Sequence, residues 1–348
     1  MNLARRLYSR FGALVITCAL LSLVGTAPDA SAGLFRRHQH QDKSSAPDCD
    51  PQVPAIASGY GADGPYKADM QSVGNPGFER KPVLVFLPQG ASGKRPVIFF
   101  SHGYGPGDWD TYGALIDHMV SLGYVVVFSS YPMVMFTEEG RYDSLWKGFQ
   151  AAADRYADHM DLSRVGFVGH SFGGGATPAM AYKGIVQQGW GKQGAFLMEL
   201  APWYSFQISD VQLQQFPAGV LQATQVYDKD SVNDHRMAID IYSHTHVTAQ
   251  YFFMVHSAEV NGCAFTADHA TPGTNASLRQ KQYAVFRPFD ALADAAFNVS
   301  AAARAALAAM GAPAMGYQPL TLETAPTPDQ PESYYKYPWS DDKNPRRN

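Results

Sequence analysis

The stretch Val165-Gly166-Phe167-Val168-Gly169-His170-Ser171-Phe172-Gly173-Gly174 decides the predicted fold. Its first four residues form an apolar run typical of a strand buried on both faces, and an Ala- and Met-rich segment of helical character follows the stretch. A serine on a tight strand-to-helix turn needs small neighbours, because the backbone there is strained and closely packed. Gly169 and Gly173 supply them, so the turn predicts an exposed Ser171 hydroxyl at a helix N-terminus, where a nucleophile would stand.

The segments around this stretch alternate between short apolar runs bounded by Pro and Gly and longer runs with helical spacing. The former predict strands and the latter helices. Such alternation indicates an α/β fold, with a mostly parallel central sheet and helices on both faces. The predicted strands are Val83–Leu87, Val97–Ser101, Tyr124–Ser129, Val165–Val168, Ala195–Leu200, Val220–Val226 and Tyr251–Val255, and helices are predicted over 112–122 and 142–160.

The two ends of the chain differ from this central region. Three arginines precede the apolar run Phe11–Val24, and small residues up to Ala32 complete the pattern of a cleavable export signal over 1–32. Residues 33–58 are polar and predict a linker, while 317–348 are rich in Pro and predict a tail that lies on the surface or is partly disordered. We therefore expect a catalytic domain over 59–316 in a secreted or periplasmic chain, cleaved after Ala32 and without stable membrane insertion.

Composition excludes some classes of partner. The chain has 348 residues, 46% hydrophobic and 17% charged, which suits a globular protein with a sizeable core. Its net charge of −4 and the absence of a basic stripe argue against nucleic-acid binding. His38 and His40 lack further ligands at a suitable spacing, so we interpret them as part of a solvated linker. We expect no metal and no cofactor.

Two cysteines, Cys49 and Cys263, remain once the export signal is removed. Because exported proteins mature in oxidising compartments, the pair predicts one disulfide, with two unpaired thiols as the alternative.

A serine nucleophile needs a base and an acid that orients the base. In this strand–turn–helix arrangement the acid follows the serine along the chain, and the histidine base follows the acid. Asp230 and His269 satisfy that order, each just past a predicted strand. Asp228 and Asp234 remain alternatives for the acid, with Asp230 preferred over Asp228. His256 remains an alternative for the base.

Stabilising the charge that develops on a carbonyl oxygen requires two preorganised backbone N–H groups. We expect one from Phe172, just after the serine, and the other from Tyr104 in the flexible loop that follows the strand Val97–Ser101. His102 is interpreted as a residue that holds this loop. Trp203 is a candidate for an apolar substrate-binding wall.

On these motifs the chain resembles a branch of the α/β-hydrolases that contains platelet-activating-factor acetylhydrolases, dienelactone-hydrolase-like proteins and bacterial cutinase-type polyester hydrolases. The resemblance covers about residues 59–310 and departs from the family in a longer loop before His269 and in the Pro-rich C-terminus. It rests on His102-Gly103, on Asp161–Val165 leading into the Ser171 motif, on Pro202-Trp203 and on the Asp230 and His269 turns.

The resemblance implies a metal-independent serine carboxylesterase that acts on a small-molecule or lipid-like ester. Three alternatives stay open: a serine peptidase or amidase, a lipase with a lid over Met133–Tyr142, and a non-catalytic binding protein of the same fold. The natural ester and the oligomeric state do not follow from the sequence.

Overall fold

The structure, a computed structural model, describes residues 49–347 except residues 106, 275 and 313–315. The predicted export signal, its cleavage after Ala32 and the polar residues 33–48 lie outside the described residues. In the part that is described, no helix combines the length and apolar character needed to cross a membrane.

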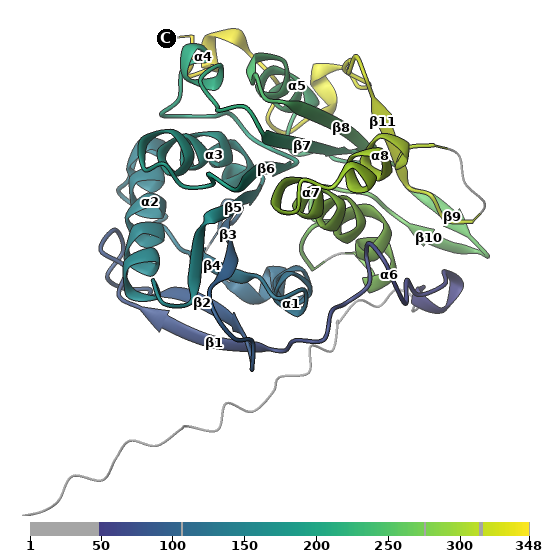
Figure 1. The fold of residues 1–348 in the computed structure, drawn as a ribbon. Coiled ribbons are helices and arrows are strands. Elements are labelled where there is room, and N and C mark those ends of the chain that lie inside the picture. Colours follow the sequence, from purple (N-terminus) through teal and green to yellow (C-terminus); the bar gives the residue numbers. More distant parts are fainter. Residues whose placement is uncertain (1–48, 106, 275, 313–315, 348) are drawn as a thin grey trace, which may run out of the picture. The chain divides into compact units, whose positions relative to one another are not determined.

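Within the described residues, nine strands form one sheet (Figure 1). They are β1 (Ala68–Val73), β2 (Val83–Pro88), β3 (Arg95–Ser101), β4 (Val125–Ser129), β5 (Met160–His170), β6 (Gly194–Leu200), β7 (Val220–Tyr227), β8 (Ala249–Val255) and β11 (Leu320–Glu323). The order is β1-β2-β4-β3-β5-β6-β7-β8-β11, and the six neighbouring strands β4, β3, β5, β6, β7 and β8 pair in parallel. β1, β2 and β11 add antiparallel pairings at the two edges. The predicted α/β fold with a mostly parallel sheet is confirmed.

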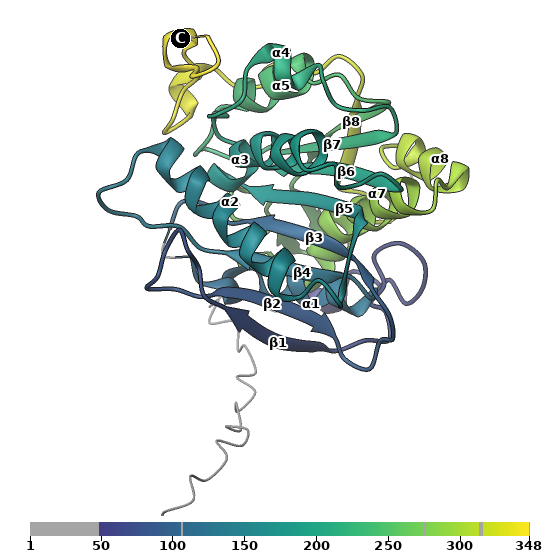
Figure 2. The same cartoon turned by 60° about the vertical axis from the view of Figure 1, so that its left-hand side comes forward.

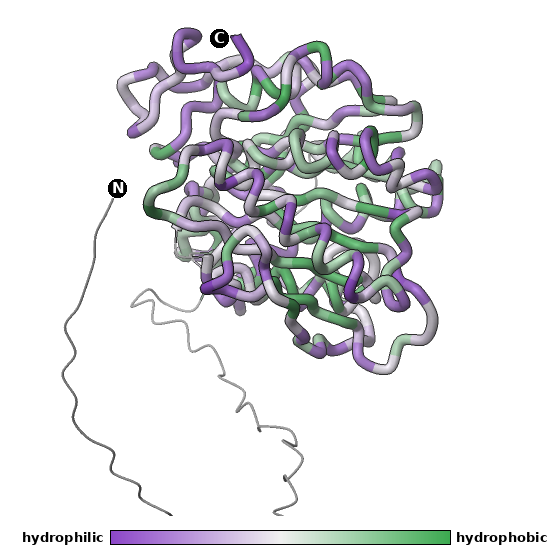
Figure 3. Tube along the Cα trace, turned by 90° about the vertical axis from the view of Figure 1, so that its left-hand side faces the viewer, coloured by the Kyte–Doolittle hydropathy of each residue, from purple (hydrophilic) through white to green (hydrophobic). Residues whose placement is uncertain are grey.

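Helices cover both faces of this sheet (Figure 2). One face packs against α1 (Gly113–Ser121), α7 (Arg287–Phe297) and α8 (Ala301–Ala309), and the other against α2 (Glu138–Arg155), α3 (Phe172–Ala181) and α5 (His235–His244). Because successive side chains of a strand point to opposite faces, Ile98 and Phe100 join the first core while Val97 and Phe99 join the second. The strongly hydrophobic segments accordingly run through the interior in Figure 3, with hydrophilic turns around them.

Shorter elements complete the fold. They are the helices α4 (Asp210–Leu213) and α6 (Leu278–Lys281), the π-helical turns η3 (Tyr182–Gln187) and η4 (Gln282–Phe286), the 3₁₀ turns η1 (Asp50–Gln52), η2 (Trp109–Tyr112), η5 (Glu332–Tyr334) and η6 (Asp341–Lys343), and the hairpin of β9 (Ala258–Val260) and β10 (Cys263–Phe265).

The predicted strands correspond to β2–β8, but the helix predicted over 142–160 is shifted. It begins at Glu138, because the Thr137 side chain accepts a hydrogen bond from the Gly140 amide and caps it, and it ends at Arg155. The chain then enters β5 at Met160.

Both ends of the described chain pack more closely than the sequence suggests. Val53 is buried beside Phe265 and Tyr317, although 33–58 was expected to be a polar linker. In the Pro-rich C-terminus, β11 joins the main sheet and Asn344 is fully buried. The described residues of these two segments are therefore parts of the fold.

Candidate active site

Ser171 occupies the turn between β5 and α3 in a strained conformation. Its φ of 57° and ψ of −118° lie in a region that residues with a side chain rarely adopt. A Cβ atom on Gly169 would lie 2.1 Å from the Gly173 carbonyl oxygen, and one on Gly173 would lie 2.0 Å from the Ser101 carbonyl oxygen. Both positions therefore require glycine, and the tight, closely packed turn predicted from the sequence is confirmed.

The structure brings Ser171, His269 and Asp230 into one hydrogen-bonded chain. The Ser171 Oγ lies 2.8 Å from His269 Nε2, and His269 Nδ1 lies 2.7 Å from Asp230 Oδ2. Asp230 is buried, and its other oxygen accepts hydrogen bonds from the amides of Val232 and Asn233. A carboxylate held in this way keeps the proton of the imidazole on Nδ1, so that Nε2 is left to accept the serine proton.

The alternative residues form hydrogen bonds elsewhere. Asp228 accepts one from the Ser257 hydroxyl at 2.6 Å. Asp234 caps the first turn of α5 and pairs with Arg236. His256 lies 2.9 Å from the Thr321 hydroxyl of β11.

His170, to which the sequence interpretation assigned no role, links the serine turn to two loops. Its Nε2–H donates to the His269 carbonyl oxygen at 2.7 Å, and its Nδ1 accepts from the Tyr112 hydroxyl at 2.8 Å. The Gly103 amide in turn donates to the Tyr112 oxygen at 3.0 Å. Burial, reinforced by the nearby His269, lowers the pKa of His170 to about 3, so its ring is neutral and its donor and acceptor are fixed.

The loop that carries Tyr104 lies directly against the serine. A Cβ atom on Gly103 would be 3.4 Å from the Cβ of Ser171. The Gly103 carbonyl oxygen accepts hydrogen bonds from the Tyr131 hydroxyl at 2.8 Å and from His102 Nδ1 at 2.7 Å. Because C=O and N–H of a trans peptide point in opposite directions, the Tyr104 N–H points away from Tyr131.

The second predicted donor, Phe172, is the first residue of α3, where backbone N–H groups have no partner within the helix.

His102 packs inside this loop. Its ring stacks on Tyr131 with centroids 4.2 Å apart, and burial lowers its pKa to about 4. These contacts fit a residue that holds the loop in place.

An apolar surface lies beside the serine. The Trp203 amide donates to the Ser171 carbonyl oxygen at 2.9 Å, and the half-buried Trp203 ring lies 5.9 Å from the Phe172 ring. The Tyr104 ring packs edge-on against Phe172 at 6.0 Å and is 61% exposed. Trp203 and Tyr104 can therefore contact an apolar ligand near Ser171.

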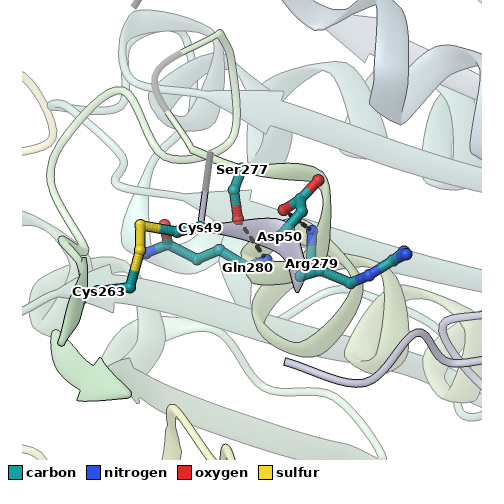
Figure 4. The surroundings of a disulfide bond; sticks show 6 residues. All are labelled: Cys49, Asp50, Cys263, Ser277, Arg279 and Gln280. Carbon is teal, nitrogen blue, oxygen red and sulfur yellow. Dashed lines mark hydrogen bonds between the residues drawn. A yellow bond between two sulfur atoms is a disulfide. The ribbon is translucent and has the colours of Figure 1, made fainter. Parts of the chain in front are cut away.

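The predicted disulfide between Cys49 and Cys263 is present, with the two Cα atoms 5.6 Å apart (Figure 4). It joins the N-terminal part of the described chain to the start of β10, which precedes the His269 loop. Beside it, Asp50 accepts a hydrogen bond from the Arg279 amide at 3.0 Å. The disulfide and this hydrogen bond thus attach the N-terminal part of the described chain to β10 and to α6.

Among the described residues, no group of three or more His, Cys, Asp or Glu side chains is arranged to hold a metal ion. Models of known protein families do not match the sequence, and a search of curated proteins gives no match either. The chemistry of the site is therefore inferred from its own geometry.

Proposed function

We propose that this chain is a serine carboxylic-ester hydrolase of the α/β-hydrolase type. In this proposal Ser171 is the nucleophile, His269 the general base and Asp230 the acid that orients it. The observation that carries the proposal is the chain of two short hydrogen bonds, 2.8 Å and 2.7 Å, that ends on a serine in a strained strand-to-helix turn.

In the acylation step, the Ser171 oxygen forms a bond to the ester carbonyl carbon while its proton passes to His269 Nε2. The carbonyl oxygen becomes an oxyanion, and Asp230 stabilises the charge that His269 acquires. The bond to the alcohol oxygen then breaks, and His269 returns the proton to the departing alcohol. Water hydrolyses the acyl-enzyme by the same sequence, so the proposed steps use protein groups and water alone.

The amides of Tyr104 and Phe172 are proposed to bind the oxyanion. Removing one such donor typically raises the barrier by about 3 kcal/mol. Trp203 is proposed to contact the apolar part of a small-molecule or lipid-like ester. Secretion or a periplasmic location is proposed from the N-terminal sequence, and the disulfide is typical of such oxidising compartments.

The test is hydrolysis of p-nitrophenyl acetate by the chain without residues 1–32. Ser171→Ala should lower kcat by about 10⁴-fold or more, because it removes the nucleophile. Ser72→Ala, on the exposed strand β1, is the matched control and should leave kcat unchanged. Equal activity of Ser171→Ala and the unaltered chain would refute the proposal, and faster hydrolysis of anilides than of esters would favour an amidase.

A further inference from the structure

The C-terminal segment, residues 335–347, runs beside the loop that follows Asp230. The Lys336 amide donates to the Ser231 carbonyl oxygen at 2.8 Å, and the Tyr337 amide donates to the Val232 carbonyl oxygen at 2.9 Å. Tyr337 and Asn233 form a parallel β-bridge. The backbone of Tyr337 is therefore fixed against the same loop that holds the proposed catalytic acid.

Contacts with Tyr204 and with Asp234, the residue that caps α5, hold the segment just beyond Tyr337. The Trp339 ring stacks on Tyr204 with centroids 5.3 Å apart, and the Trp339 amide donates to Asp234 Oδ2 at 2.9 Å. The Ser340 amide donates to the Tyr204 hydroxyl at 2.8 Å. Tyr204 follows Trp203 directly, so this attachment lies next to the proposed substrate wall.

Ion pairs fix the end of the segment. The Arg346 side chain is 1% exposed and pairs with Asp210 at 2.8 Å and with Asp240. Asn344, fully buried, also donates to Asp240. The segment is thus attached at three successive places and is built into the fold on the side of the active site.

The Tyr337 side chain extends the apolar surface beside Ser171. Its ring lies 6.3 Å from the Trp203 ring, edge-on, and Trp203 in turn packs against Phe172. The side chain of Asn233, which pairs with Tyr337 through the backbone, lies 3.5 Å from the Ser171 Oγ. Tyr337 remains 43% exposed although the Lys336 ammonium lies 5.2 Å from its ring centroid, so part of the residue is accessible to a ligand.

We propose that Tyr337 is a specificity residue that contacts the apolar group of an ester at the point where this group extends past Trp203. The inference rests on the proposed ester hydrolysis and names its substrate class, an ester with a long apolar acyl or alcohol group. A small acetyl group bound at Ser171 would end near Trp203, whereas a longer chain or a ring would continue along the Tyr337 face. The C-terminal segment therefore supplies part of the substrate site.

The experiment compares kcat/KM in two series with the unaltered chain and with Tyr337→Ala. One series varies the acyl group from p-nitrophenyl acetate to the octanoate, and the other varies the alcohol from ethyl acetate to octyl acetate. Tyr337→Ala should lower the ratio of long-ester to short-ester kcat/KM roughly tenfold in one of the series, mainly through KM. The series in which the ratio falls identifies whether the acyl or the alcohol group lies against Tyr337.

Two variants and a labelling step make the outcome decisive. Tyr337→Phe keeps the ring and should preserve the ratio. Tyr334→Ala removes a nearby aromatic ring, which packs on Tyr335, and should also preserve the ratio. An unchanged ratio for Tyr337→Ala in both series would overturn the inference. If the unaltered chain neither hydrolyses esters nor reacts with a fluorophosphonate at Ser171, the proposed function itself has failed.

Discussion

His170 Nε2 lies 2.7 Å from the carbonyl oxygen of His269, so the residue before the proposed nucleophile holds the backbone of the proposed base. Through Tyr112, the same ring is connected to the amide of Gly103. One buried chain of hydrogen bonds thus joins the serine turn, the histidine loop and the loop that carries Tyr104. We interpret His170 and Tyr112 as positioning residues for the proposed catalytic groups.

Tyr112→Phe should lower kcat by about 10- to 100-fold with little change in KM. A small displacement of His269 or of the loop that carries Tyr104 reduces the stabilisation of the transition state and leaves substrate binding unchanged. Steady-state kinetics on a p-nitrophenyl ester measures both constants. Tyr156→Phe is the matched control, since it also removes a single hydrogen-bonding tyrosine hydroxyl, one that donates to the Ser72 carbonyl oxygen on the edge strand β1. If the two variants lose the same fraction of kcat, the positioning role of Tyr112 is wrong.

Asp230→Asn should reduce kcat by about 10⁴-fold, because an amide cannot hold the required proton arrangement on His269. Asp228→Asn alters only a contact with Ser257 and should reduce kcat less than tenfold. The comparison is made on purified variants with unchanged far-ultraviolet circular dichroism. A larger loss in Asp228→Asn than in Asp230→Asn would reverse the assignment of the acid.

Much of the fold was predictable from the sequence, because the central strands are buried on both faces and therefore read as continuous apolar runs. Strand β1 escaped prediction because nearly all of it is exposed and its few apolar residues form no continuous run. The edge strand β11 was missed for a related reason, since Leu320–Glu323 is short and lies among prolines.

The sequence indicates the order serine, acid, histidine and favours Asp230, but it leaves Asp228 open as an alternative acid. The choice between them depends on the turn after β7, where the Asp230 amide bonds back to the Tyr227 carbonyl oxygen at 2.9 Å. The contacts of His170 with Tyr112 and of Tyr337 with Trp203 join residues far apart in the sequence. No local pattern of residue types predicts such contacts.

Removing the disulfide with the double substitution Cys49→Ser and Cys263→Ser should lower the free energy of unfolding by about 2 to 5 kcal/mol, because the unfolded chain is no longer closed into a loop. Urea denaturation followed by tryptophan fluorescence measures this change. A reductant should destabilise the unaltered chain but have no further effect on the double variant. Equal stability of the two proteins would contradict a structural role for the bond.

His118 predicts a pH dependence of stability. Burial lowers its pKa, but hydrogen bonds to Asp290 at 2.8 Å and Asp63 at 2.7 Å outweigh burial and raise the pKa to about 9. Since this value exceeds that of an unfolded histidine, about 6.5, the stabilisation is complete below about pH 6.5 and is lost as the pH rises through about 9. The loss can reach about 3 kcal/mol.

Urea denaturation between about pH 6 and about pH 10 measures this loss, and His118→Gln should flatten the decline because it removes the titrating group. If the free energy of unfolding of His118→Gln falls with rising pH as steeply as that of the unaltered chain, groups other than His118 cause the decline.

Covalent labelling tests the central claim most directly. The chain without residues 1–32 is treated with a fluorophosphonate, digested with trypsin and analysed by mass spectrometry. The proposed mechanism predicts an adduct on the peptide 165–183, in which Ser171 is the one serine, and much slower labelling of Asp230→Asn. A folded protein that takes up no label, or that is labelled on a different serine, would contradict the assignment of Ser171 as the nucleophile.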